Sequence, residues 1–346
     1  MKHLTLLIAI LFISLTYSCE SEGEETPDIP VLSVLATSVI SETGFQLNWS
    51  ISKLEGFQSI SIAVSKDKEL ATIIESFELD DITRESLLVS DLQGATIYYF
   101  RISLMHNGVT VAESDIEAAE TSYRMESFQI VTEDAYSLSS KLSYLESKAG
   151  SRPGIIMMHE FGVWVNPWVG SDLLRQLVAD GYVCLTFFFR GHGTSTPVDD
   201  PMDLINDKSL LTRDLQATID YMNENELVSG ELGLIGGSMG AIMALAGNGY
   251  EEVLTSVALS PTRDGVFLIF PNMTLSSVYY LVGELDIHDL EGGDFPAETN
   301  ILYELTEEPR KLNIIPGTAD HGTNLLSRDS LNTSIKEWFR ALLPLE

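Results

Sequence analysis

The sequence predicts a small all-β, immunoglobulin-like sandwich followed by a larger α/β unit, in which a mostly parallel sheet is flanked by helices. Over residues 31–121, short runs of alternating apolar and polar residues are separated by turn residues, which is typical of antiparallel sandwiches. Over residues 122–346, strand-like and helix-like stretches alternate, which predicts parallel strands joined by helical crossovers. Several of these strand-like runs are apolar throughout, as expected for strands that are covered on both faces.

Composition and charge narrow the class of protein further. The chain has 346 residues, with 20 Lys and Arg against 51 Asp and Glu, and a formal net charge of −31. An acidic excess of this size excludes electrostatic attraction to nucleic-acid phosphates, so we expect no nucleic-acid partner. The two cysteines, Cys19 and Cys184, cannot make a disulfide framework. Cys184 lies inside an apolar strand-like run and is expected to fill the core.

Residues 1–19 are expected to be an export signal rather than part of the fold. They carry a basic start, an apolar run of about a dozen residues and then Cys19. The run is shorter than the ~20 residues that a membrane-spanning helix needs. This arrangement resembles a bacterial lipoprotein signal, in which the cysteine is lipidated, although Thr16 stands where that class usually has leucine. The alternative is an ordinary signal peptide with an incidental Cys19.

Residues 20–30 are rich in glutamate and contain two prolines. Such a segment cannot bury apolar surface and predicts an extended acidic tether. Acidic residues directly after the cysteine also resemble the surface-export signal of bacterial lipoproteins. The resemblance implies an exported lipoprotein at the outer membrane or cell surface, anchored to the membrane by the lipid on Cys19.

Two features of residues 31–121 sharpen the prediction of a sandwich. Trp49 lies in an early strand, where its ring would fill the space between two sheets. Leu92, Thr96 and Tyr98 stand at the spacing of a tyrosine corner, and the segment resembles a fibronectin type III domain. It holds no cluster of histidine, cysteine or paired carboxylates with catalytic spacing. We therefore expect a spacer or docking module, whose partner the sequence does not specify.

A candidate nucleophile lies in the second unit. The run GGSMG at 236–240 falls between a strand-like and a helix-like stretch, which is the place of the G-x-S-x-G turn that presents a serine hydroxyl at a helix N-terminus. A side chain at either flanking glycine would clash in so tight a turn. Because a serine hydroxyl is a weak nucleophile at neutral pH, Ser238 would need an adjacent base.

The base and its acid are expected at the carboxyl ends of later strands, where ligands of such sheets bind. Of the six histidines, His321 is the best candidate, because it lies in a loop directly after the strand-like run KLNIIPG. Asp286 follows another such run, from which it would orient the imidazole and stabilise its charged form. Glu284, Asp289 and the more distant Asp264 are alternatives for the acid.

Motifs spread along the whole second unit resemble those of the α/β-hydrolase superfamily, most closely its small, lidless branch around dienelactone hydrolases and carboxylesterases. The order Ser238, Asp286, His321 is also the chain order of that fold's catalytic triad. The resemblance implies an α/β-hydrolase fold for residues 122–346. The motifs are HEFG at 159–162, RGHG at 190–193, GGSMG at 236–240, GELD at 283–286 and DHGTNLL at 320–326.

The same resemblance implies an oxyanion hole made of two backbone N–H groups. One is that of Met239, the residue after the nucleophile, and the other, by position, is that of Phe161. The sequence departs from the family at Glu160, where a glycine is usual. Dienelactone hydrolases carry a glutamate in a similar loop, where it contacts a cysteine nucleophile. Glu160 could therefore modulate Ser238, or it could point to solvent.

These residues predict a serine hydrolase that cleaves esters through an acyl-enzyme, with no cofactor. A metal site has little support, because the His159-Glu160 pair does not continue as H-E-x-x-H. The same triad could cleave an amide or peptide bond. A further alternative is a non-catalytic surface binding or adhesion protein that kept the fold.

The substrate class follows less directly. Only about sixteen residues join two of the later strands where many hydrolases insert a lid, so we expect an open pocket with a short flap at 266–270. From the acidic composition we also expect an acidic site that disfavours strongly anionic substrates. Short acyl esters, on small molecules or linked to glycans, are the expected substrates.

Overall fold

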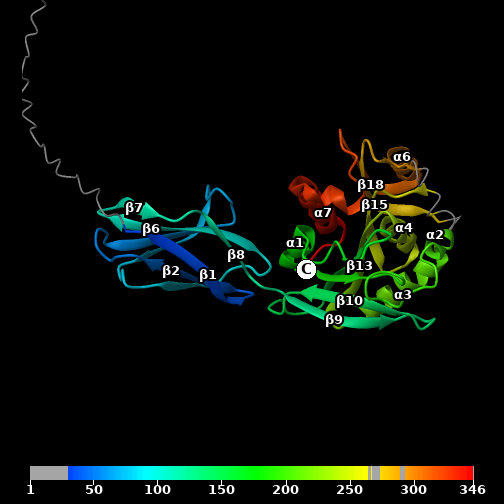
Figure 1. Ribbon diagram of the computed structural model, residues 1–346. Coiled ribbons are helices and arrows are strands. Elements are labelled where there is room, and N and C mark those ends of the chain that lie inside the picture. The colour runs from blue at the N-terminus through cyan, green and yellow to red at the C-terminus, as the bar shows by residue number, and fades with distance from the viewer. Residues whose placement is uncertain (1–29, 264–265, 267–272, 289–292, 346) are drawn as a thin grey trace, which may run out of the picture.

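The computed structural model describes residues 30–263, 266, 273–288 and 293–345, which form two parts (Figure 1). None of the helices within these ranges is long and apolar enough to cross a membrane. Several sequence predictions lie outside the described residues: the signal with Cys19, nearly all of the acidic tether, Asp264, Asp289 and most of the flap.

The first part consists of two facing antiparallel sheets, as predicted. One has the strand order β1-β2-β5, and the other has the order β4-β3-β6-β7, with β8 also paired to β6. Trp49 is fully buried between them, in a core of aromatic and branched apolar side chains. The strands are β1 (Leu32–Ser41), β2 (Gly44–Ile51), β3 (Ser59–Ser65), β4 (Ile73–Leu79), β5 (Ser86–Val89), β6 (Ile97–His106), β7 (Val109–Glu113) and β8 (Glu117–Glu120).

Tyr98 ties the start of β6 to the chain before it. Its buried hydroxyl accepts a hydrogen bond from the Gln93 N–H at 2.8 Å and lies 3.4 Å from the Gln93 carbonyl oxygen, to which it donates. A tyrosine that bonds to backbone a few residues upstream is the geometry of a tyrosine corner.

The second part is built on one eight-stranded sheet with the order β18-β15-β14-β13-β11-β12-β10-β9. Its neighbours are parallel from β18 to β12, and β10 and β9 add an antiparallel edge. The strands are β9 (Arg124–Val131), β10 (Ser137–Tyr144), β11 (Arg152–Met158), β12 (Val183–Phe187), β13 (Val228–Gly237), β14 (Val253–Leu259), β15 (Leu275–Gly283) and β18 (Thr306–Ile315). A separate short ribbon joins β16 (Ile287–His288) to β17 (Gly293–Asp294).

Helices cover both faces of this sheet, which explains its apolar central strands. One face packs against α1 (Asp172–Asp180) and α7 (Asp329–Leu342). The other packs against α3 (Ser209–Glu224), α4 (Met239–Ala246) and α6 (Phe295–Leu305), with the short α2 (Asp203–Asn206) nearby. Every residue of β11 and β12 is buried. Cys184 is a free, buried cysteine within β12, as predicted for a core residue.

The sandwich contacts the α/β part through several polar bonds. Glu42 accepts the N–H groups of Glu146 and Ser147 at 2.7 and 2.9 Å, and the Gln93 side chain donates to the Ala179 carbonyl oxygen at 2.7 Å. In Figure 1, α2, α4 and α6 lie at the opposite end of the α/β part from the sandwich. The sandwich is therefore remote from the pocket that these three helices line.

Candidate active site

Ser238 occupies the turn between β13 and α4 in a strained backbone conformation. Its φ is +50°, in the left-handed region that side chains other than glycine rarely adopt. A methyl group placed on Gly236 would collide with the backbone of Gly240, and one placed on Gly240 would collide with the Met158 carbonyl. The two glycines are therefore required by the close approach of α4 to β13 and β11.

Asp286 and His321 meet at the carboxyl ends of β15 and β18. Both carboxylate oxygens of Asp286 lie 3.0 Å from His321 Nδ1, and the Asp286 side chain is fully buried. A carboxylate at Nδ1 fixes the proton there and leaves Nε2 as the basic nitrogen. The geometry is that of an acid that orients a base.

Ser260, which the sequence analysis did not single out, completes this arrangement. Its hydroxyl donates to Asp286 Oδ2 at 2.6 Å and accepts the Gly322 N–H at 3.0 Å. Ser260 thus joins Asp286 to Gly322, the residue after His321. It directly follows β14, so a polar residue at the carboxyl end of a parallel strand was the signal that could have revealed it.

Glu284, the alternative acid that the structure describes, contacts a different part of the loop that carries His321. Glu284 is exposed, and its carboxylate accepts the Gly317 N–H at 2.7 Å. Its role in the structure is therefore to hold the start of the loop that carries His321.

Ser238 lies at the same edge of the sheet as His321. A Cβ built on Gly237, directly before Ser238, would lie 3.1 Å from the backbone nitrogen of Thr323. The rings of His321 and Phe295 meet edge to face with centroids 4.5 Å apart, and Phe295 and Ser238 line one pocket. The Ser238 hydroxyl makes no hydrogen bond to any residue in the described ranges, and catalytic hydrogen bonds are often longer in ligand-free structures than during reaction.

The two backbone groups expected to form an oxyanion hole lie at this pocket. Phe161 and Met239 both line it, and within the described part of the chain neither N–H has a hydrogen-bond acceptor. The N–H of Gly162 is instead bonded to His192 Nε2 at 3.0 Å. Two unoccupied donors beside a serine hydroxyl suit a developing negative charge.

Glu160 makes a contact that neither sequence alternative included. Its Oε1 accepts the N–H of Thr323 at 2.5 Å, so the loop after β11 is bonded to the loop that carries His321. The side chain is half-buried. Its carboxylate is therefore directed to the loop that carries His321.

Two buried histidines hold the loop that contains Phe161. His159 Nε2 accepts the Phe189 N–H at 3.1 Å, and its Nδ1 lies 2.6 Å from the Glu160 carbonyl oxygen, to which it donates. His192 uses its two nitrogens in the same way, toward Gly162 N–H and the Arg190 carbonyl oxygen. Each needs one nitrogen as an acceptor and so must be neutral. Burial lowers the pKa of His159 to about 3 and also lowers the pKa of His192.

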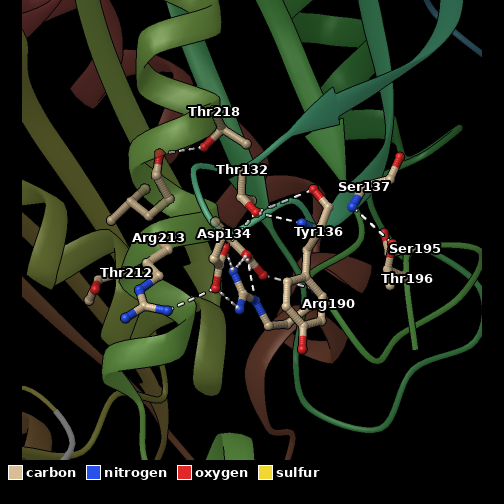
Figure 2. Close-up of polar contacts among 12 residues, drawn as sticks. Thr132, Asp134, Tyr136, Ser137, Arg190, Ser195, Thr196, Thr212, Arg213 and Thr218 are labelled. Carbon is tan, nitrogen blue, oxygen red and sulfur yellow. Dashed lines mark hydrogen bonds and ion pairs between the residues drawn. The ribbon is translucent and has the colours of Figure 1, made fainter. Parts of the chain in front are cut away.

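Arg190 anchors the loop that carries His192 to the body of the domain (Figure 2). Its guanidinium is buried and bonds to both oxygens of Asp134 at 2.7 and 2.9 Å and to Asp214 at 2.8 Å. It also stacks 4.1 Å from the centre of the Tyr136 ring, and Arg213 adds a further bond to Asp134 at 2.9 Å. The Arg190 guanidinium holds the pKa of Asp134 well below its usual range.

The pocket beside Ser238 has a volume of about 430 Å³. Among the described residues that line it, Lys208 is the one ionised side chain, and there is no carboxylate. Across the described lining, the expectation of an acidic site, drawn from net charge, finds no support. The described lining consists of Phe161, Met202, Ile205, Lys208, Ser238, Met239, Ile242, Ser260, Thr262 and Phe295.

Comparisons with known proteins agree with this architecture. Residues 155–330, about half of the chain, match the model of the alpha/beta hydrolase family. A search of the curated proteins found no match.

Several solved structures share the fold of the α/β part. DcsB, solved with its substrate analogue, is 14% identical with a TM-score of 0.52, covering 64% of this chain and 99% of its own. A predicted CIB-like hydrolase from Thermoplasma acidophilum is 15% identical with a TM-score of 0.50, covering 64% and 100%. The esterase Pf2001 from Pyrococcus furiosus is 21% identical with a TM-score of 0.48, covering 64% and 94%. At such identities, the likeness to DcsB and to the CIB-like hydrolase shows the fold alone.

Proposed function

We propose that this chain, which belongs to the alpha/beta hydrolase family, is a serine hydrolase that cleaves carboxylic esters through an acyl-enzyme. The observation that carries the proposal is the contact of His321 Nδ1 with both oxygens of the buried Asp286, at the sheet edge where Ser238 stands on its strained turn. A binding protein has no need of an oriented imidazole beside a serine. The arrangement suits activation of a hydroxyl nucleophile.

In the proposed reaction, Ser238 Oγ attacks the ester carbonyl carbon while His321 Nε2 accepts the hydroxyl proton. Asp286 stabilises the resulting imidazolium, and the N–H groups of Met239 and Phe161 donate to the oxyanion. The tetrahedral intermediate collapses, and the alcohol leaves with the proton from His321. His321 then deprotonates a water molecule, which attacks the acyl carbonyl carbon. The bond to Ser238 Oγ breaks, the carboxylic acid is released, and His321 returns the proton to Ser238 Oγ.

The size and lining of the pocket support short acyl esters as substrates. A volume of about 430 Å³ lies at the small end of the range for ligand pockets, and most of its lining is apolar. Esters of small molecules and acyl groups linked to glycans both fit this class. Amide or peptide hydrolysis by the same three residues is the alternative, and a panel of matched esters and amides separates the two.

Fluorophosphonate labelling with kinetics on p-nitrophenyl butanoate tests the proposal. Ser238→Ala should abolish labelling and lower kcat by about 10⁵- to 10⁶-fold, the loss typical of a nucleophilic serine. Ser90→Ala, an exposed serine of the sandwich, is the control and should leave both unchanged. An unlabelled wild-type chain that hydrolyses neither esters nor amides would favour the alternative of a non-catalytic binding or adhesion protein.

We also infer that residues 31–121 are a fibronectin type III-like domain that spaces the hydrolase, residues 122–346, from a lipid anchor on Cys19. The tyrosine-corner geometry of Tyr98 supports the first part, and the signal-like start and acidic tether support the second. Metabolic labelling with palmitate in a bacterial host, with Cys19→Ser as the control, tests the anchor. Protease accessibility on intact cells tests the proposed surface location.

A further inference from the structure

Lys208 places a positive charge in the pocket beside Ser238. It lies between α2 and α3, directly before the first residue of α3, and it shares the pocket with Ser238, Met239 and Phe161. The remaining lining that the structure describes is uncharged. A cation at this position is notable because the chain as a whole carries a net charge of −31.

The protein does not neutralise this ammonium within the described part of the chain. Lys208 Nζ donates to the Ile205 carbonyl oxygen at 2.9 Å, and no described carboxylate pairs with it. The adjacent carboxylate of Asp207 is bonded instead to Ser209, whose N–H lies 3.1 Å away. Burial lowers the pKa of Lys208.

The other cations of this region are paired. Arg190 pairs with Asp214 and with Asp134, which also pairs with Arg213 (Figure 2). An ammonium has three donors, so Lys208 has two that the Ile205 carbonyl does not use. A half-buried ammonium keeps part of its hydration, and its unused donors are open to an acceptor that enters the pocket. A substrate anion would supply both the charge and the acceptor.

We propose that Lys208 binds a carboxylate on the part of the substrate that occupies this pocket, so that the preferred esters carry an anionic group. The proposal rests on the proposed ester hydrolysis at Ser238 and names its substrate class. It reverses the expectation, drawn from net charge, that anionic substrates are disfavoured. The local charge at the pocket acts over a short distance, whereas the charges of the outer surface are screened by salt.

Matched esters test the proposal. p-Nitrophenyl pentanoate and the p-nitrophenyl monoester of glutaric acid differ only in that a terminal methyl group is replaced by a carboxylate. On the alcohol side, phenyl butanoate and 4-carboxyphenyl butanoate differ in that a ring hydrogen is replaced by a carboxylate. For at least one pair, the wild-type kcat/KM should favour the anionic ester. Lys208→Met should lower the ratio of anionic to neutral kcat/KM by about 10- to 100-fold, the range for loss of one charge-assisted hydrogen bond.

Two variants control for charge and for general damage. Lys208→Arg, which keeps the charge, should hold the ratio within about threefold. Lys141→Met removes a half-buried lysine of β10 and should leave the ratio unchanged. A ratio that Lys208→Met does not move, or an equal loss on both members of each pair, would overturn the proposal.

A binding measurement separates this proposal from the proposed reaction. Monomethyl glutarate and dimethyl glutarate are titrated by NMR against Ser238→Ala and against Ser238→Ala/Lys208→Met. Tighter binding of the monoester that disappears with Lys208→Met supports the subsite even if the wild type hydrolyses no ester. Equal binding of the two compounds to both proteins overturns the subsite and leaves the proposed reaction standing on its own test.

Discussion

The carboxylate of Glu160 accepts the backbone N–H of Thr323 at 2.5 Å. The bond joins the loop after β11, which carries Phe161, to the loop after β18, which carries His321. Glu160 and Thr323 are 163 positions apart in the sequence. Glycine at position 160 could not make this bond. The departure from the family pattern therefore has a structural consequence: the proposed oxyanion donor and the proposed base are held in one frame.

Glu160→Ala should lower kcat by about 10- to 100-fold with little change in KM. The reason is that the loss of a charge-assisted hydrogen bond loosens the position of His321 without removing any substrate contact. Glu160→Gln retains a carbonyl acceptor and should recover most of the activity. Steady-state kinetics on a neutral p-nitrophenyl ester provide the measurement.

Glu284→Ala is the matched control for this prediction. Glu284 also accepts a backbone N–H of the loop before His321, but it is exposed and bonds to Gly317 instead. We expect less than about a threefold change in kcat. Loss of all activity would instead assign the acid role to Glu284 and contradict the one proposed for Asp286.

Ser260→Ala should lower kcat by about tenfold or more. The hydroxyl donates to Asp286 and accepts from Gly322, so its removal leaves a buried carboxylate and a buried N–H each without one partner. Ser256→Ala is the control: this buried serine lies in β14, the strand that Ser260 directly follows, and donates to the Ala244 carbonyl oxygen. A loss of stability without a loss of kcat in Ser260→Ala would show that Ser260 acts on the fold alone.

The sequence predicted the all-β sandwich and the mostly parallel sheet of the α/β part. It also predicted the strand–turn–helix around Ser238 and the strand-end positions of Asp286 and His321, because each has a local pattern. Alternation, continuous apolar runs and the glycines at 236 and 240 are all visible along the chain. Trp49 in an early strand and Tyr98 at the spacing of a tyrosine corner likewise indicated the sandwich.

The contacts that surround these residues could not be predicted in the same way. Ser260 has only a weak local signal, a polar residue directly after a strand, and no local motif marks Lys208. The contacts of both form only when distant segments meet. Net charge did not indicate the lysine among the described lining residues, because net charge averages over the whole surface and a pocket is lined by few side chains. Of the two tryptophans after the loop of Phe161, Trp168 is fully buried and Trp164 is 78% exposed, a difference that the sequence did not predict.

Arg190→Met should lower the free energy of unfolding by about 3–5 kcal/mol, because it leaves two carboxylates without the buried cation that they share. Arg213→Met, which removes a half-exposed guanidinium bonded to the same Asp134, should cost less than about 1 kcal/mol. Urea unfolding of both variants gives the comparison. Equal losses would mean that the ion pairs contribute alike and that burial of Arg190 has no special effect.

The neutral histidines predict how stability depends on pH. Burial lowers the pKa of His159 to about 3, below the ordinary value of about 6.5 in an unfolded chain. Above pH 6.5 the imidazole is neutral in both states. Between pH 6.5 and 3 the imidazole is protonated in the unfolded state but not in the folded state. The free energy of unfolding should therefore fall by about 1.4 kcal/mol for each unit by which the pH is lowered, from this residue alone.

Nitrogen chemical shifts from long-range ¹⁵N–¹H NMR spectra check this prediction directly. At pH 5 the shifts should show His159 neutral, with the proton on Nδ1, because Nε2 must accept the Phe189 N–H. His159→Gln should flatten the difference in stability between pH 6.5 and 4 relative to the wild type. A charged imidazolium at pH 5 in the folded protein would contradict the tautomer, and with it the bond by which His159 holds the loop of Phe161 against the loop of Phe189.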